Sequence, residues 1–160
     1  MKRILALLIL VASTSVSAAE PDPRAVIANY LNEPDVPGEV FSQAQRFDHF
    51  KYRAALRLAV AKDRSGLLDI LQYNGRTSLI GAGGEDHAAI LVALLSIWGD
   101  AGFSQVLQSC SPKAVSVTRD FLEYGGASKR KFPRTFSVHG EGANNSFKPK
   151  PLGGSVSLRR

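Results

Sequence analysis

The sequence predicts an all-α protein: a small bundle or short solenoid of about five to six helices with a disordered C-terminal tail. Apolar residues recur at spacings of three and four through most of the chain, which is the helical period. No segment shows the convincing alternation of apolar and polar residues that a half-buried strand requires. Hydrophobic residues make up 44% of the 160 residues, enough for one apolar core.

The first 19 residues have the three parts of a secretory signal peptide. Lys2 and Arg3 precede an apolar run over residues 4–12, and small residues follow up to Ala18 and Ala19. A helix that crosses a membrane needs roughly 20 apolar residues, about twice the length of this run. We therefore expect cleavage near Ala18/Ala19, a periplasmic or secreted location, and no transmembrane segment in the mature chain.

Residues 20–40 form a proline-containing lead-in with one short helix. Asp22 followed by Pro23 is typical of a helix start, because the aspartate caps the backbone N–H groups and proline fits the first turn. The apolar stripe that follows extends this helix through Leu31.

The first half of the helical domain, which we expect over residues 41–124, contains two helical segments. Residues 41–62 have no glycine or proline and carry one apolar stripe, which predicts a continuous helix. Ser65 is expected to cap a second, short helix, which ends at Asn74 and Gly75.

The second half of the domain contains the most apolar helix. We interpret residues 81–84, which are rich in glycine, as a flexible linker before a helix over residues 86–98. That helix is apolar on nearly every side and should be central and buried. Gly99 ends it and another helix follows, after which Ser111-Pro112 is a strong start signal for the last helix, with Gly125 as its stop.

A weak internal repeat links the two halves. A register of 36 residues aligns Leu58 with Leu94 and Gly66 with Gly102. Residues 54–71 resemble a degenerate ankyrin-type repeat, and residues 103–122 resemble a HEAT-type hairpin. The helical-repeat resemblance as a whole extends over about half of the chain. The resemblance implies an α-solenoid, although residues 54–57 lack the ankyrin signature. Two unrelated amphipathic hairpins would show the same spacing, because all α-helices share one period.

The C-terminal segment, residues 125–160, differs from the rest of the chain in composition and charge. It is rich in glycine, proline and asparagine, and it carries eight basic residues against Glu141 alone. We interpret it as a disordered tail, because it cannot bury enough apolar area to offset its chain entropy. Its most concentrated basic residues are candidates for binding an anionic lipid or saccharide, although a solvated tail is the simpler interpretation. They are Lys129, Arg130, Lys131 and Arg134.

Two short segments pair histidine with carboxylates and are the only catalytic or metal-binding candidates. These residues are Asp48, His49, Glu85, Asp86 and His87. Such groups can serve as a general base or hold a divalent ion if the two segments meet. Neither segment has two histidines at helical spacing, and Glu85 and Asp86 have a sufficient structural role at a helix N-terminus.

No other chemical motif supports catalysis or a cofactor. The glycine-rich segment lacks the lysine and hydroxyl of a phosphate-binding loop, and no serine lies in a nucleophile elbow. Cys110 is the single cysteine, so it cannot form an internal disulfide and is expected to be a small buried side chain.

These observations favour an exported, non-catalytic helical module that binds another envelope or secreted protein, as inhibitors, immunity proteins and assembly factors do. No cofactor, metal or nucleic acid is expected. A small exported hydrolase or metal-binding protein, and a binder of anionic surfaces through the basic tail, are the alternatives.

Overall fold

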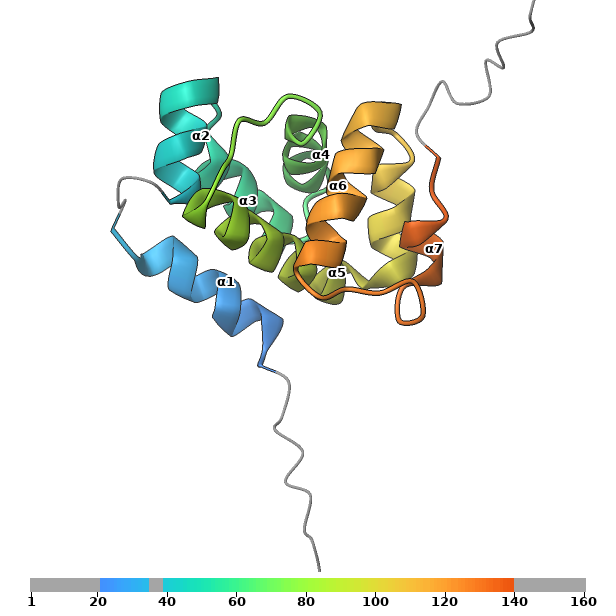
Figure 1. Cartoon of the computed structure of the whole chain (residues 1–160). Helices are drawn as coiled ribbons and strands as arrows, with labels where there is room; N and C mark the ends of the chain where they lie inside the picture. Colours follow the sequence, from blue (N-terminus) through green and yellow to red (C-terminus); the bar gives the residue numbers. More distant parts are fainter. Residues whose placement is uncertain (1–20, 35–38, 140–160) are drawn as a thin grey trace, which may run out of the picture.

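The fold is described from a computed structural model, which covers residues 21–34 and 39–139 (Figure 1). Within these ranges all regular secondary structure is helical, so the predicted fold class is confirmed. The expectations for residues 1–19 and 140–160 lie outside the described residues. The helices are α1 (Pro23–Asn32), α2 (Val40–Asp48), α3 (Tyr52–Val60), α4 (Arg64–Tyr73), α5 (Ala82–Leu107), α6 (Pro112–Tyr124) and α7 (Pro133–Phe136).

Helix α5 is the centre of the molecule, and the other helices surround it (Figure 1). It contacts each of the other six, and Ile90, Leu91 and Leu94 are among its fully buried side chains. The prediction of a central, buried helix here is therefore confirmed. By length and composition α5 is the one helix in the described ranges that could cross a membrane, but half of its apolar window is buried inside the domain, as in a core helix.

Gly99 divides α5 into two helical segments. Its backbone angles, φ 71° and ψ 160°, are not helical and are strongly unfavourable for residues with a side chain. The predicted end of one helix and start of the next therefore fall where the structure changes direction.

The prediction of a single helix over residues 41–62 is wrong, because the chain turns between α2 and α3. His49 ends α2 in the left-handed conformation, with φ 52°. After this turn Phe50 stacks on Tyr73, with the ring centroids 4.3 Å apart, and Tyr52 is fully buried. An apolar stripe cannot reveal the break, because the aromatic residues that stabilise the turn also fit a helical pattern.

Three helices begin at side-chain caps, of which the sequence identified two. The carboxylate of Asp22 accepts from the backbone N–H of Arg24, and the hydroxyl of Ser111 accepts from Ala114. The cap of α4 is Asp63, which accepts from the backbone N–H of Ser65 at 2.8 Å; the sequence-based choice of Ser65 as the cap is wrong. Aspartate and serine are both good helix caps, so the sequence alone does not distinguish Asp63 from Ser65, which is two residues later.

The packed domain extends beyond the predicted limits of residues 41 and 124 at both ends. Helix α1 packs on α3 and α5 and buries Ile27 completely. Residues 125–139 are ordered against α5, with Phe132, Phe136 and Val138 buried. The prediction that disorder begins at residue 125 is therefore wrong for these fifteen residues. Glycine, lysine and arginine make up six of these fifteen residues, and the three buried apolar side chains anchor the segment.

Cys110 is buried, as expected, and its thiol lies 3.8 Å from the carbonyl oxygen of Val106.

Candidate functional site

The first predicted pair, Asp48 and His49, lies at the end of α2. His49 is exposed, whereas Asp48 accepts hydrogen bonds from the Tyr73 hydroxyl at 2.6 Å and from the backbone and hydroxyl of Ser78. Partial burial alone would raise the pKa of the Asp48 carboxyl, but the bonds from Tyr73 and Ser78 hold it below its ordinary value. This carboxylate therefore remains charged and fixes the segment that contains Ser78.

The second predicted histidine, His87, is fully buried in α5. Its Nε2 lies 2.7 Å from the side-chain oxygen of Asn74, and its Nδ1 is hydrogen-bonded to the Tyr52 hydroxyl. The Asn74 amide donates to Thr118, so its oxygen is the acceptor from Nε2–H. Nδ1 then accepts from Tyr52. Burial lowers the pKa of His87 to about 3, and the imidazole is neutral at ordinary pH.

This buried chain of hydrogen bonds ends at a backbone carbonyl, because the Thr118 hydroxyl donates to Ala114 at 2.7 Å. No buried side-chain nitrogen or oxygen lacks a partner in the described part of the chain. Each polar side-chain atom of the network therefore has a partner, and the network ties α3, α4, α5 and α6 together.

The predicted residues do not assemble a metal site. In the described ranges no three histidine, cysteine or acidic side chains lie close enough together to hold an ion. Glu85 and Asp86 instead accept hydrogen bonds of 3.3 Å from the hydroxyls of Tyr124 and Tyr30. Burial, followed by the charge and hydrogen bond of Asp86, raises the pKa of Tyr30 to about 12.

The interpretation of residues 81–84 as a flexible linker is wrong, because α5 begins at Ala82. Gly83 packs directly against the buried side chain of Gln43 on α2. A Cβ atom at residue 83 would lie 2.6 Å from Nε2 of Gln43, closer than real contacts of this kind. The glycine therefore makes room for the glutamine.

Gln43 holds the backbone of Ile80 through two hydrogen bonds. Its amide Nε2 donates to the Ile80 carbonyl at 2.9 Å, and its Oε1 accepts from the Ile80 N–H at 3.1 Å. Asp48 holds Ser78 in a similar way two residues earlier. The loop before α5 is thus fixed on its inner side, while the Ile80 side chain is 71% exposed.

A shallow apolar hollow of about 300 Å³ lies beside Ile80. We call it, with its lining residues, the Ile80 surface. Tyr124, which also lines it, is 68% exposed, and Glu85 is the one charged residue of the lining. The lining residues are Leu79, Ile80, Gly81, Gly84, Glu85, Phe121 and Tyr124.

Sequence reasoning identified Glu85 but missed Gln43, Ile80 and Tyr124. A usable signal existed for Gln43, because it lies on the buried face of α2 beside Val40 and Ala44, where a polar side chain needs a specific partner. No sequence pattern indicates that Ile80 is exposed. Its neighbour Leu79, also apolar and in the same loop, is buried.

The predicted anion-binding residues lie on an ordered segment between α6 and the end of α7. Lys129, Arg130, Lys131 and Arg134 are exposed, and buried Phe132 anchors the segment between them. The carboxylate of Asp100 accepts from the backbone N–H groups of Arg134 and Thr135 at 2.9 and 2.8 Å. Binding of an anionic partner by these residues remains a prediction.

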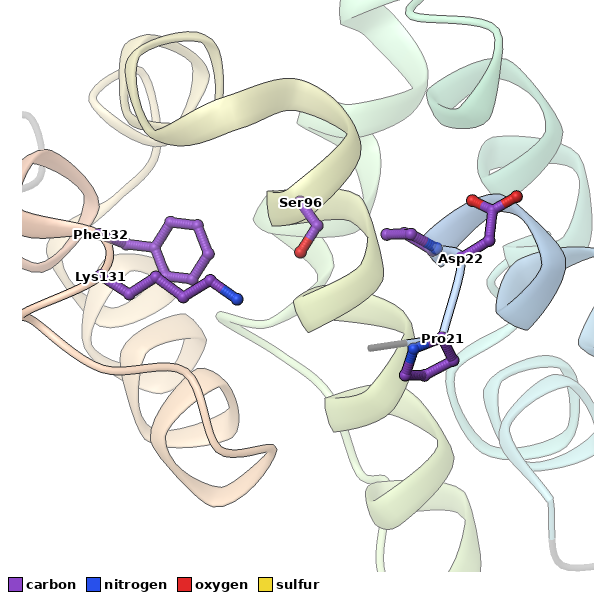
Figure 2. Close-up of a pocket in the computed structure, with 6 residues that line it drawn as sticks. Pro21, Asp22, Ser96, Lys131 and Phe132 are labelled. Atoms are coloured by element: carbon purple, nitrogen blue, oxygen red, sulfur yellow. The ribbon is translucent and has the colours of Figure 1, made fainter. Parts of the chain in front are cut away.

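A further hollow of about 310 Å³ separates this segment from the start of α1 (Figure 2). Lys131 and Phe132 lie on one side, Pro21 and Asp22 on the other, and Ser96 of α5 between them.

Neither a protein-family model, nor a curated protein, nor a solved structure matches this chain.

Proposed function

We propose that this chain is a non-catalytic protein-interaction module and that it binds an exported partner through the Ile80 surface. The observation that carries the proposal is the exposure of Ile80 on a loop whose backbone is held by buried Gln43. Ile80 and Tyr124 expose large apolar side chains around one hollow, and exposed apolar side chains that are grouped in this way are typical of interaction surfaces.

Rigid presentation favours binding, because the loop loses little conformational freedom when a partner covers it. Tyr124 adds an aromatic side chain of the kind that dominates binding energy in protein interfaces. Its hydroxyl is bonded to Glu85, which limits its motion as well.

The chemistry of the surface defines the partner segment. The hollow takes an apolar side chain between Ile80 and Phe121, and Glu85 at its edge pairs with a lysine or arginine beside that side chain. The occupant we propose is therefore an apolar and basic segment of a second protein.

Site-specific photo-crosslinking in the producing cell tests this surface. A photoreactive amino acid at position 80 or 124 should give one discrete adduct, and Ile80→Asp should abolish the adduct formed from position 124. Position 47 is the matched control, since Phe47 is exposed but does not line the hollow. Equal adducts from positions 47 and 80, or an adduct that survives Ile80→Asp, would contradict the proposal.

Export is the second part of the proposal and is supported by the signal-like pattern of residues 1–19. The intact mass of the protein recovered from cell fractions tests it. We expect a mature chain that begins at residue 19 or 20 in the envelope or the medium. A full-length chain in the cytosol would overturn it.

A hydrolase or metal-binding function gains no support from the geometry, because exposed His49 and buried His87 do not contribute to one cluster.

A further inference from the structure

The Ile80 surface continues along α6 as an apolar stripe. Val117, Phe121 and Tyr124 follow one another at spacings of four and three residues, so they lie on one face of the helix. Val117 and Phe121 are half-buried, and Tyr124 is exposed. We propose that the partner segment bound here is a basic amphipathic helix that lies along α6; this inference rests on the proposed function.

The loop between α4 and α5 runs beside α6 for about two helical turns. At its start, a Cβ atom at Gly75 would lie 3.4 Å from the Cβ of Ala114. Just after its end, a Cβ atom at Gly84 would lie 3.9 Å from the Phe121 ring. Ala114 and Phe121 are seven residues apart in the chain, which is about 10 Å along a helix axis. The length over which the loop and α6 stay together therefore matches about two turns of a partner helix.

The backbone of this loop is not available to a partner strand. The N–H groups of Ser78, Leu79 and Ile80 donate to side-chain oxygens at 3.1, 3.2 and 3.1 Å. The acceptors are the side chains of Asp48, Thr77 and Gln43. A strand added to an edge needs free N–H groups along it, and the interior of α6 bonds within its own helix. A partner therefore meets this surface through side chains.

A helix is the partner structure that fits such a surface. An extended segment would bury its own N–H and C=O groups against apolar side chains without partners, which is unfavourable. A helix bonds these groups internally and presents side chains alone. Its apolar stripe would pack between Ile80 and the stripe on α6, as in other complexes in which a helix lies in a groove.

Two carboxylates indicate that the polar edges of this partner helix are basic. Glu85 lines the hollow and accepts a hydrogen bond from the Tyr124 hydroxyl. Asp120 is exposed on α6, one turn before Tyr124. The described lining of the hollow includes no lysine or arginine. Basic side chains on the partner helix would therefore pair with carboxylates of the surface.

Photo-crosslinking at two positions of the full chain, in the producing cell, tests the helix. Positions 117 and 124 lie about 10 Å apart along α6. Photoreactive side chains there should react with one partner segment, at residues about seven apart, because a partner helix also rises about 1.5 Å per residue. Mass spectrometry of the adducts locates these residues. A separation of about three residues would indicate an extended or polyproline segment and overturn the helix.

The outcomes separate this inference from the proposed function. No adduct from position 80 or 124 would overturn both. Adducts from positions 80 and 124 without one from 117 would leave the proposed function intact and overturn the helix. If the label at position 117 lowers the melting temperature, exposed position 120 replaces it. The partner residues should then be about four apart for a helix, against about two for an extended segment.

Charge variants test the basic character of the partner. Asp120→Lys should reduce the yield of the adduct from position 124 roughly five- to tenfold, because it replaces attraction by repulsion. Asp69→Lys on α4 makes the same change at an exposed residue outside the hollow and is the matched control. An undiminished yield with Asp120→Lys, or an equal loss with Asp69→Lys, would overturn the basic helix.

Discussion

At the scale of single residues, the polar side chains hold this domain in one arrangement. The hydrogen-bond chain from Tyr52 through His87 and Asn74 to Thr118 joins four helices in the middle of an apolar core. Apolar side chains alone tolerate several packings, whereas a buried polar group is stable only where its partners are present.

The buried imidazole makes folding stability depend on pH. Burial lowers the pKa of His87 to about 3 in the folded state, against an ordinary value of 6.5. The unfolded chain therefore binds more protons below pH 6.5, and stability decreases as the pH falls. We expect a loss on the order of 2 to 3 kcal/mol between pH 7 and pH 4.5, measured by urea unfolding.

The carboxyl groups with lowered pKa values do not obscure this window. Asp48, Asp63 and Asp100 start from an ordinary pKa of 3.8, so their contribution to stability is lost only below about pH 4. His87→Gln should be less stable at pH 7 but should show a flatter profile between pH 7 and pH 4.5. An unchanged slope in that variant would assign the effect to another group.

Gly83 is the residue on which the Ile80 loop depends. Gly83→Ala places a methyl group 2.6 Å from the amide nitrogen of Gln43 and should cost roughly 1 to 3 kcal/mol in the free energy of unfolding. Gly84→Ala is the matched control, because its nearest neighbour outside its own helix is 3.8 Å away. Gly84→Ala should be neutral or slightly stabilising in the same urea titration. Equal effects of the two variants would contradict the close packing.

At the scale of elements, the positions at which helices break define the fold as much as the helices themselves do. The break at Gly99 was predictable, because glycine followed a long apolar run and aspartate came next. The break at His49 was not, because it depends on the stacking of Phe50 on Tyr73, a contact 23 residues apart in the chain. The two glycines aligned by the 36-residue register also differ in their surroundings. A Cβ atom at residue 66 would clash with the backbone of α3, whereas a Cβ atom at residue 102 would meet only Trp98, at an ordinary distance of 3.6 Å. The solenoid resemblance stays a prediction.

The break within α5 should resist substitution. Gly99→Ala forces a side chain into φ 71° and ψ 160° and should cost at least roughly 1 to 3 kcal/mol. Gly102→Ala, three residues later, meets only ordinary contacts at 3.6 Å and should be neutral or stabilising. Thermal unfolding of the two variants checks this. A melting temperature of Gly99→Ala equal to that of the natural chain would contradict the non-helical backbone at residue 99.

At the scale of the whole molecule, the sequence predicted the class and the central helix well, because both follow from apolar periodicity. It failed at the C-terminal boundary, because composition averages over a segment whereas packing depends on individual side chains. Phe132, Phe136 and Val138 bury their side chains among basic and glycine residues. The Ile80 surface was likewise beyond reach, because it is formed by a loop and two helices that meet only in the fold.

The length of the packed domain can be tested by truncation. A chain that ends at Tyr124, the boundary expected from composition, should lose roughly 4 kcal/mol or more, because it exposes the surface that these three side chains cover. A chain that ends at His139 retains all three and should keep a cooperative unfolding transition. Urea unfolding of both proteins measures the difference, and equal stabilities would show that residues 125–139 contribute no packing energy.

The single tryptophan of the chain, Trp98, donates its indole N–H to the carbonyl of Ala59 at 2.9 Å and stands next to Gly99. Its ultraviolet emission therefore comes from one position, where the end of α3 meets the bend of the central helix. When α3 separates from α5, that emission should shift to longer wavelength as water reaches the indole ring. The protein thus contains an intrinsic fluorophore with which folding kinetics at this junction can be followed without any label.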